Sequence, residues 1–539
     1  MTIIPKLCGA DIELGNFIEG RDGSRGTGDA AADALLREIH GLPERAPSYY
    51  SRYGGYNAQD RGRRYLRENG GCFYIDLDHL ELALPEVRSA YDHVACFHAM
   101  LRMAGRAQVA ANAKLPEGER IQVLVNNTDG QGHSYGSHLN FLLARKTWND
   151  IFRWKLQQML FLAAYQVSSI VMTGQGKVGA EDGMPAVEYQ LSQRADFFAC
   201  LVGEQTTFNR PIVNSRDEAL CGSYRLQPEP GSAGDRLARL HVIFYDTTLC
   251  PVGNLLKVGV MQLVLGLIET SGARPELLLD DPLTALWRWS RDPSLKTTAP
   301  LMSGQNVTAV ELQRMFWEAV RPLVERGDCD EAVPEARPIF ETWGETLTWL
   351  ERGDFDRLAR RLDWVLKSAI IQRALAQHPG LTWASPEIKH LDHLYGSLDG
   401  GLYWTMEHAG MVERVVTDEQ IARFESEPPD DTRAWTRAMI LRQSEPDAVT
   451  HVDWDSIEVQ LPDRSQWPRH RTLEMADPLS FTRRQTEFLF NGQRKLDDIL
   501  DCLGATDLNS NGFYSTTKAS PSPIIVPSNY ESHTEGGRS

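Results

Sequence analysis

The clearest alternation of hydrophobic and polar residues lies in residues 70–86 (GGCFYIDLDHLELALPE). Tyr74, Asp76 and Asp78 fall on alternate positions, and hydrophobic residues fill the positions between them. Because a β-strand points successive side chains to opposite faces, this pattern predicts a strand with one hydrophobic and one acidic face. Carboxylates on one face repel each other unless a cation or proton lies among them, so this face is a candidate metal or acid–base site. An ordinary antiparallel strand with one solvated face explains the same alternation.

A second stretch, residues 7–17 (LCGADIELGNF), alternates in the same way. Ile12 and Leu14 alternate with Asp11, Glu13 and Gly15, which again predicts a strand with an acidic face. If the two strands pair in one sheet, carboxylates from both converge. Their hard oxygen atoms suit Mg²⁺ or Mn²⁺, and Mg²⁺ is usually bound together with phosphate groups. Two unrelated solvated strands are the alternative.

The rest of the hydrophobic pattern is mostly helical. Residues 121–143 differ, because two hydrophobic runs flank a Gly- and Asn-rich turn and so predict a hairpin. A short strand pattern recurs at Val452–Val459. The predicted helices are Asp29–Ile39, Glu86–Ala111, Trp154–Ile170, Leu256–Ile268, Ala309–Glu325, Ile339–Glu351, Phe355–Gln377, Ile388–Tyr395 and Leu496–Leu503. Residues 504–539 are rich in Ser, Asn and Pro, which predicts a disordered tail.

The composition narrows the class of protein. Of 539 residues, 42% are hydrophobic and 24% are charged, as in an ordinary globular protein. The net charge of −17 argues against a general nucleic-acid-binding protein. No hydrophobic run approaches the ~20 residues that span a bilayer, and the N-terminal residues lack a secretory signal. Eight cysteines without a CxxC pair indicate a reducing compartment, so we expect a cytoplasmic protein that binds neither nucleic acid nor membrane.

Arginines punctuate the hydrophobic segments between residues 189 and 249. They are Arg194, Arg210, Arg216, Arg236 and Arg239. The guanidinium group is permanently charged and binds phosphate in a bidentate way, so these side chains are suited to hold phosphates. Structural salt bridges to the acidic residues beside them explain the same pattern, and the sequence leaves both open. The Gly-rich turn at residues 172–179 (MTGQGKVG) matches neither a P-loop nor a dinucleotide fingerprint.

Together these blocks resemble the family of Pup ligases and Dop, glutamine-synthetase-like carboxylate–amine ligases that attach, deamidate or remove the small protein modifier Pup. GADIELG resembles the family's opening G-x-E-x-E-[FY]-G, and FYIDLDHLE resembles its [LV]-Y-[LV]-D followed by H-P-E. The segments NNTDGQGHSYGSH, TGQGKVG, LSQRAD, IVNSRDE and RLHVI follow in the family's order, with PPDDTRA and VDWD late in the chain. The resemblance covers roughly residues 6 to 470.

This resemblance implies an α+β fold, with a glutamine-synthetase-like curved antiparallel β-sheet cradle backed by helices. The concave face of the sheet holds ATP and Mg²⁺ in the family, and a small C-terminal domain lies over the nucleotide. We therefore expect a catalytic domain at residues 1–410, the small domain at 411–503 and the disordered tail at 504–539. The family's nucleotide-contacting tryptophan falls on Trp454, and Arg433 in the TRA motif is a candidate for contacting the phosphates or the substrate carboxylate.

The other functional positions of the family fall on the two acidic stretches. Its metal ligands fall on Asp11, where the family has Glu, and on Tyr74 and Glu81. Its catalytic aspartate falls on Asp76. Asp78 has no counterpart in the family. The resemblance thus assigns metal binding and chemistry to different residues of one acidic face.

Several segments favour Dop over the ligase. Five positions separate Asp76 from Glu81, one fewer than in the ligase, and SYGSH, SRDPSL, LTWASPEIKHLD and GGLYW are also Dop-like. The implied activity is deamidation of a Pup-like modifier or cleavage of its isopeptide bond to target lysines, with a functional link to a bacterial proteasome. The alternative is a ligase that joins the modifier's C-terminal Glu to lysine with ATP hydrolysis.

The chain also departs from the family. Cys72 replaces an ATP-contacting arginine, and Leu84 replaces a small polar residue. Leu139 and Pro251 each stand where a glutamate is usual, and ALCG at 219–222 replaces PHAD. These departures leave a third possibility open, a catalytically impaired relative that binds a Pup-like tail.

Overall fold

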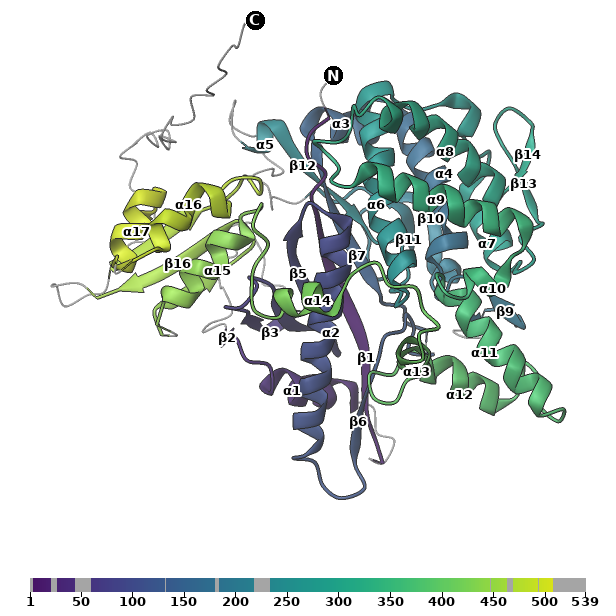
Figure 1. Ribbon diagram of the computed structural model, residues 1–539, viewed down its shortest axis with the longest axis horizontal. Coiled ribbons are helices and arrows are strands. Elements are labelled where there is room, and N and C mark those ends of the chain that lie inside the picture. The colour runs from purple at the N-terminus through teal and green to yellow at the C-terminus, as the bar shows by residue number, and fades with distance from the viewer. Residues whose placement is uncertain are drawn as a thin grey trace, which may run out of the picture.

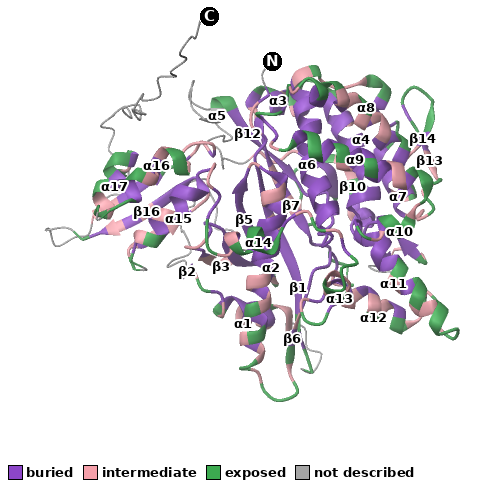
Figure 2. Ribbon diagram, viewed as in Figure 1, coloured by how far each residue is buried: buried purple, intermediate pink, exposed green. Residues whose placement is uncertain are grey.

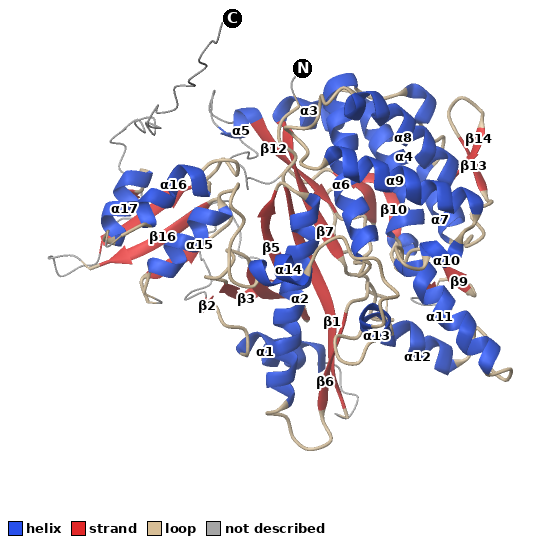
Figure 3. Cartoon of the chain, in the orientation of Figure 1, coloured by secondary structure: helices blue, strands red, loops and turns tan. Residues whose placement is uncertain are grey.

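An eight-stranded sheet lies at the centre of the computed structural model, which describes residues 3–20, 27–43, 60–130, 132–179, 184–217, 233–445, 447–462, 469–492 and 494–507 (Figures 1 and 3). Its strands are β1 (Cys8–Glu19), β2 (Leu42–Pro43), β3 (Asp60–Tyr65), β4 (Cys72–Asp76), β5 (His79–Val87), β6 (Arg120–Leu124), β7 (Ser137–Ala144) and β12 (Leu237–Val242). They run in the order β12-β7-β1-β5-β4-β3-β2, and β6 pairs with β1 off this path. All these pairings are antiparallel, as the resemblance implies.

The acidic stretch at residues 70–86 forms two strands, so the prediction of a single strand was wrong. A tight turn at Leu77 and Asp78 joins β4 to β5, and Leu77 has a left-handed φ of 54°. A non-glycine residue in this region is uncommon, and it allows the chain to reverse within two residues. Tyr74 and Asp76 keep the predicted alternation, whereas Asp78 lies exposed in the turn. The strand predicted around Asp11 is confirmed as β1.

The hairpin predicted at residues 121–143 was also wrong, because its two strands do not pair with each other. β6 pairs with residues 15–19 of β1, and β7 pairs with residues 8–12 of the same strand. β1 has 12 residues and is long enough to serve both partners in succession. The segment between β6 and β7 therefore runs along β1 near Gly15 instead of forming a simple turn, and a Cβ atom at that glycine would meet the Tyr135 hydroxyl at 2.4 Å.

Helices cover one face of the sheet and extend into a bundle beside it (Figure 1). They are α1 (Thr27–Arg37), α2 (Ala90–Asn112), α3 (Arg145–Asn149), α4 (Leu156–Thr173), α5 (Ala233–Arg236), α6 (Pro251–Ser271), α7 (Pro282–Ser290), α8 (Ala309–Glu325), α9 (Ala336–Arg352), α10 (Phe355–Leu358), α11 (Asp363–Gln377), α12 (Pro386–Leu394), α13 (Leu402–His408) and α14 (Asp418–Phe424). The predicted helices are present, except that Phe355–Gln377 is divided into α10 and α11. Between α4 and α8 the chain also forms short strands that pair in twos. β8 (Lys177–Val178) pairs with β9 (Tyr189–Gln190), β10 (Phe198–Gly203) with β11 (Arg210–Asn214), and β13 (Thr298–Pro300) with β14 (Asn306–Thr308).

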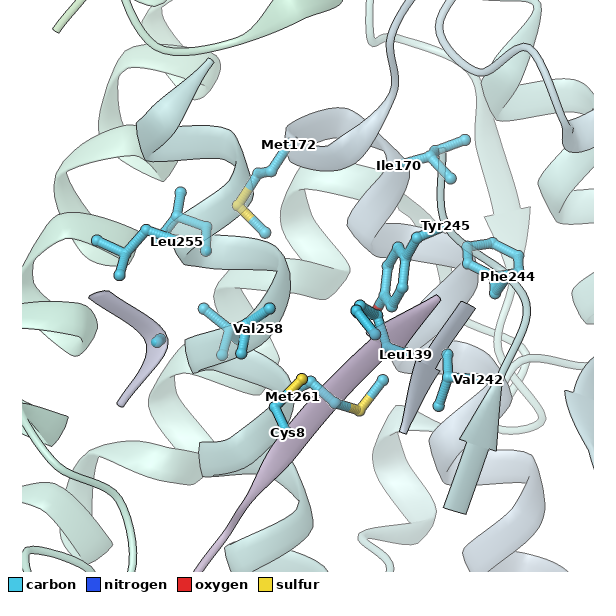
Figure 4. Close-up of a cluster of buried hydrophobic side chains, with 14 of the residues drawn as sticks. Cys8, Leu139, Ile170, Met172, Val242, Phe244, Tyr245, Leu255, Val258 and Met261 are labelled. Carbon is cyan, nitrogen blue, oxygen red and sulfur yellow. The ribbon is translucent and has the colours of Figure 1, made fainter. Parts of the chain in front are cut away.

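The main hydrophobic core lies between the sheet and these helices (Figure 2). Ile12 of β1 and Leu82 of β5 point into it from the face opposite the acidic residues. Leu139 of β7 lies in the same core beside Met261 and Val258 of α6 (Figure 4). Burying such side chains contributes about 1.5–3 kcal/mol each, so the hydrophobic half of the alternating pattern fixes which face is left for chemistry.

α6 (Pro251–Ser271) is long and apolar enough to cross a membrane by length and composition alone. Its most apolar window is 100% buried inside the protein, among the sheet, α2, α4, α8 and α9. It is thus placed as the central helix of the core.

A small domain lies beside the sheet, on the side away from the helical bundle (Figure 1), and a second hydrophobic core joins it to strands β2–β5. It contains α15 (Ala434–Gln443), β15 (Val449–Val452), β16 (Ser456–Leu461), β17 (Arg469–Glu474), α16 (Arg483–Phe490), α17 (Leu496–Leu503) and β18 (Thr506–Asp507). Cys72 and Tyr74 of β4 pack into its hydrophobic core, whereas residues 412–424 pack with the larger core. Residues 508–539 of the predicted tail lie outside the described residues.

Candidate active site

Three carboxylates meet on the sheet face that turns away from α1 and α2. Glu13 of β1 lies directly opposite Glu81 of β5, and Glu81 lies opposite Tyr74 of β4. One oxygen each from Glu13, Asp76 and Glu81 can be chosen so that all three atoms lie within 4.8 Å of one another. The Tyr74 hydroxyl lowers the pKa of Glu81, against the larger effects of burial and the neighbouring carboxylates. Cross-strand pairing thus brings residues that are up to 68 positions apart in sequence into one cluster.

The electrostatics of this cluster favour a bound cation or a shared proton. Burial and then the charge of Asp76 raise the pKa of Glu13 from 4.5 to about 7, although the Gly136 N–H donates to it at 2.9 Å. Burial and then Glu13 and other carboxylates raise the pKa of Glu81 well above its usual value. Oε2 of Glu81 is buried and has no hydrogen-bond partner among the described residues. Such crowded, desolvated oxygen atoms match the donor set of a hard divalent cation.

Asp11, predicted as a metal ligand, lies on the same face but outside this group of three. It accepts a hydrogen bond from the Asn140 side chain at 3.0 Å, and its charge contributes to the raised pKa of Glu81. Glu13, to which the sequence analysis gave no role, lies within the cluster. The sequence alternation could have indicated Glu13, because this residue lies two positions from Asp11 and therefore on the same face of the strand. The roles of Asp11, Tyr74 and Glu81 as ligands, and of Asp76 in catalysis, stay predictions.

A group of arginines faces the same part of the sheet and surrounds His138 of β7. Burial and then the nearby guanidinium groups lower the pKa of His138 well below its usual value. These groups belong to Arg194, Arg210, Arg216 and Arg239. Arg236 differs, because it forms an exposed ion pair with Asp477 at 3.3 Å. The two interpretations of the arginines therefore apply to different residues. Arg236 forms a surface salt bridge, and the other four arginines concentrate positive charge where an anion would be stabilised.

Arg194 is the most constrained member of this arginine group. It is fully buried, and burial and then Arg210 lower its pKa to about 9. Nη1 donates to the Tyr245 carbonyl at 3.2 Å, whereas Nε and Nη2 are buried without a hydrogen-bond partner among the described residues. A buried cation with unused donors is costly unless an anion completes its hydrogen bonds, so Arg194 fits a phosphate or carboxylate ligand.

The carboxylate of Asp246 sets the position of Arg194. One oxygen accepts the Gln175 and Gln193 backbone N–H groups at 2.9 and 3.0 Å, and the other accepts the Ser192 hydroxyl at 2.9 Å and the Arg194 N–H at 3.2 Å. Asp246 thus ties the turn in TGQGKVG to the turn in LSQRAD. These motifs, which match no phosphate-binding fingerprint in sequence, act together in the fold as the support of one arginine.

A pocket with about 510 Å³ of empty space, which includes open solvent, lies between the sheet and the small domain. Asp11, Leu84 and Arg239 line it from the sheet, and Trp454 and Arg433 line it from the small domain. The two small-domain residues predicted to contact a nucleotide therefore reach one pocket with Asp11. In this arrangement the Arg433 guanidinium donates to the Glu86 carboxylate at 2.7 Å.

The departures from the family pattern fall in different environments. Leu139 is buried in the core on the face opposite the acidic cluster (Figure 4), and Pro251 is the first residue of α6, where proline is favourable. Leu139 therefore does not point into the cluster of carboxylates. Leu84 lines the pocket, and Cys72 is fully buried against the small-domain core. Residues 219–222 lie outside the described residues.

Comparisons with known proteins agree with this geometry. The family model for the Pup-ligase protein matches residues 32–458. The Pup deamidase/depupylase of Mycolicibacterium smegmatis is 36% identical over 391 residues, covering 72% of this chain and 74% of that protein. A solved complex of Pup with its ligase PafA aligns with a TM-score of 0.73 at 25% identity, covering 93% of this chain and 91% of that one. PafA in complex with ADP aligns with a TM-score of 0.65 at 26% identity, covering 83% and 90%. The chain therefore belongs to the Pup-ligase family of proteins.

Proposed function

We propose that this protein is a Dop-like hydrolase that deamidates a Pup-like modifier, cleaves its isopeptide bond to lysine, or does both. The observation that carries the proposal is the meeting of a three-carboxylate cluster with buried arginines beside one pocket. The identity to a Pup deamidase/depupylase supports the direction of the reaction. The partners are then the modifier and its lysine conjugates, with a functional link to a bacterial proteasome.

The cofactors of the proposal are Mg²⁺ and ATP. Glu13, Tyr74 and Glu81, with Asp11 beside them, are the residues that would hold the metal, because their crowded oxygen atoms fit a hard cation. The pocket under Trp454 would take the nucleotide, as the solved PafA structure holds ADP. Bound Mg²⁺, together with the arginines around His138, would supply positive charge that stabilises an oxyanion on the substrate carbonyl.

Asp76 is the proposed catalytic residue. It lies at the end of β4, only half-buried, whereas Glu13 and Glu81 are buried. As a base, its carboxylate takes a proton from water while the water oxygen bonds to the carbonyl carbon and the C–N bond breaks. As a nucleophile, its oxygen bonds to that carbon and water then cleaves the acyl intermediate. As a base, Asp76 passes that proton to the departing nitrogen; along the nucleophilic route the nitrogen takes a proton from the water molecule, whose hydroxide then cleaves the acyl intermediate. Both routes consume one water molecule and release ammonia or a lysine amine.

The test is incubation of the protein with ATP, Mg²⁺ and modifier peptides that end in Gln or Glu, followed by mass spectrometry. Conversion of the Gln form to the Glu form, with loss of ammonia, is the expected result. We expect Asp76→Asn to abolish processing while thermal stability and ADP binding stay close to those of the unchanged protein. Unchanged processing by that variant would refute the assignment of Asp76.

A ligase is the second candidate, because the solved structures that align with the chain are of a Pup ligase. In that reaction ATP phosphorylates the modifier's C-terminal Glu, Asp76 deprotonates a target lysine, and the amine displaces phosphate. The same assay separates the two, since only a ligase conjugates the Glu-ending peptide to lysine. Binding of the peptide with no turnover of either form would support the impaired relative that Cys72 and Leu84 raise as a third possibility.

A further inference from the structure

A buried ion cluster made of Glu86, Arg433 and Arg437 joins the sheet to the small domain. The Glu86 carboxylate receives Arg433 Nε at 2.7 Å on one oxygen and Arg437 Nη2 at 2.5 Å on the other. Their side chains are 8%, 3% and 1% exposed. Burial opposes ionisation of Glu86, but the two arginines outweigh it and lower its pKa to about 2. The cluster is therefore charged and desolvated at neutral pH.

An irregularity in β5 is what turns Glu86 toward the small domain. The register between β1 and β5 shifts between Cys8 and Ala10, so that Leu84 faces Ala10 and Val87 faces Cys8. A bulge of this kind inserts an extra residue and re-aims the side chains beyond it. Glu86 consequently lines the pocket instead of continuing the hydrophobic face of Leu82 and Leu84.

The same cluster holds the pocket's tryptophan. The Arg437 guanidinium lies over the Trp454 ring at 4.8 Å, and its Nη1 donates to the Trp454 carbonyl at 3.0 Å. Its Nε donates to the Gly70 carbonyl at 3.0 Å, so one side chain contacts both the turn before β4 and the loop before β16. Thr432, next to Arg433, donates to the Glu86 carbonyl at 2.8 Å. These contacts join elements from opposite walls of the pocket.

We infer that Glu86 is a positioning residue that, through Arg437, holds Trp454 over the pocket and couples ligand binding in the pocket to docking of the small domain. This inference rests on the proposed function only in taking a nucleotide as the ligand of the pocket. Arg433 and Glu86 line the pocket, whereas Arg437 reaches it through Trp454. Coupling is reciprocal, so a ligand that contacts Trp454 in the docked arrangement must also stabilise docking.

Loss of this ion cluster should change the pocket, whereas loss of an ordinary buried salt bridge changes only the stability of the fold. Removing the Glu86 charge leaves the two buried guanidinium groups of Arg433 and Arg437 side by side without their carboxylate, and movement of α15 away from β5 relieves them. Movement of α15 carries Arg437, and with it the support of the Trp454 ring. The expected loss is therefore specific to the pocket and the strands that carry Trp454.

The experiment measures hydrogen exchange and ADP binding in the full chain. We expect Glu86→Gln to increase amide exchange in residues 449–461 of the ligand-free protein and to weaken ADP binding by calorimetry at least tenfold. Arg437→Lys keeps a charge beside Glu86 but loses the three separate nitrogen atoms that donate to Gly70, Trp454 and Glu86. It should therefore act in the same direction, and it decides the question if Glu86→Gln does not fold. ADP should protect residues 449–461 in the unchanged protein and protect them less in the variants.

Asp392→Asn is the matched control. Asp392 is likewise a buried carboxylate between two cations, Lys367 at 2.8 Å and Lys389 at 3.1 Å, but it lies on α12 and does not line the pocket. It should lose stability without a change in ADP affinity. ADP affinity and exchange within twofold of the unchanged protein in Glu86→Gln or Arg437→Lys would overturn the inference, as would an equal loss of affinity in Asp392→Asn. Failure of the peptide assay would count against the proposed function alone, because the exchange of the ligand-free variants still decides this inference.

Discussion

Replacing Glu13 by Gln should stabilise the metal-free protein at pH 8, although it removes a residue of the candidate active site. Glu13 is buried beside Asp76 and Glu81, and its pKa rises from 4.5 to about 7. Gln keeps an oxygen that can accept the Gly136 N–H hydrogen bond, which spans 2.9 Å. The substitution therefore removes charge while keeping shape and the main hydrogen bond, so its effect reports on electrostatic crowding alone.

The magnitude follows from the raised pKa. Below pH 4.5 Glu13 is protonated in both the folded and the unfolded state, so its raised pKa takes nothing from the free energy of unfolding there. As the pH rises towards 7 the unfolded state releases the proton first, so the free energy of unfolding falls by about 3 kcal/mol at 1.36 kcal/mol per pKa unit. Gln does not titrate, and the variant should lack this loss. Mg²⁺ should reverse the order, because at 100 times its Kd it stabilises a protein that binds it by about 2.7 kcal/mol.

Urea denaturation followed by circular dichroism at pH 5 and pH 8, with EDTA or with Mg²⁺, measures each of these quantities. Glu19→Gln is the control, since Glu19 lies exposed at the end of the same strand. We expect Glu13→Gln to exceed the unchanged protein in stability at pH 8 with EDTA and to gain less from Mg²⁺. A variant that is less stable at pH 8 in EDTA, or that gains as much from Mg²⁺, would refute a cation site among these carboxylates.

Three further substitutions test the surroundings of the cluster. Arg194→Met should lower the rate of peptide processing at least 100-fold, because removing one preorganised donor to a developing anion costs about that much; a rate within tenfold in the mass-spectrometry assay contradicts an anion site there. Gly136→Ala should also lower it, since a Cβ atom would meet Asn127 Oδ1 at 2.5 Å and Arg194 Nη1 at 2.9 Å; unchanged kinetics would show that Arg194 need not stay in place. Cys72→Arg should lower the urea midpoint by the equivalent of about 3 kcal/mol, because it puts a charge into the small-domain core; a stable variant that binds ADP more tightly would contradict that placement.

Alternation alone predicted much of the acidic face. The period of two in β1 and β4 predicted which residues share a face, and the core on the other side confirms the hydrophobic half of each pattern. The helix prediction succeeded for a similar reason, since each long helix buries a continuous hydrophobic face. Periodicity reports which side a residue takes within one strand. It carries no information on which strand lies next to it.

The errors come from features that depend on pairing. The hydrophobic positions of residues 70–86 change from odd to even between Leu77 and Leu80, which marks the turn, but the prediction treated the two runs as one strand. β6 and β7 looked like a hairpin because nothing in their own residues shows that β1 is long enough to accept both. Glu13 was missed as a cluster member because its membership depends on lying opposite Glu81. Glu86 faces the small domain only because of a register shift.

The division of the concave face into an acidic and a basic half is the strongest constraint on what the site binds. Each half has an unfavourable electrostatic environment without a ligand. Burial and mutual repulsion raise the pKa values of Glu13 and Glu81, and Arg194 has buried N–H groups that donate to no described residue. A ligand that brings a cation to one half and an anion to the other relieves both at once. A metal–polyphosphate does this, whereas an uncharged ligand relieves neither. Since Leu139 is buried in the core on the other face of the sheet, the departure at that position leaves this requirement intact.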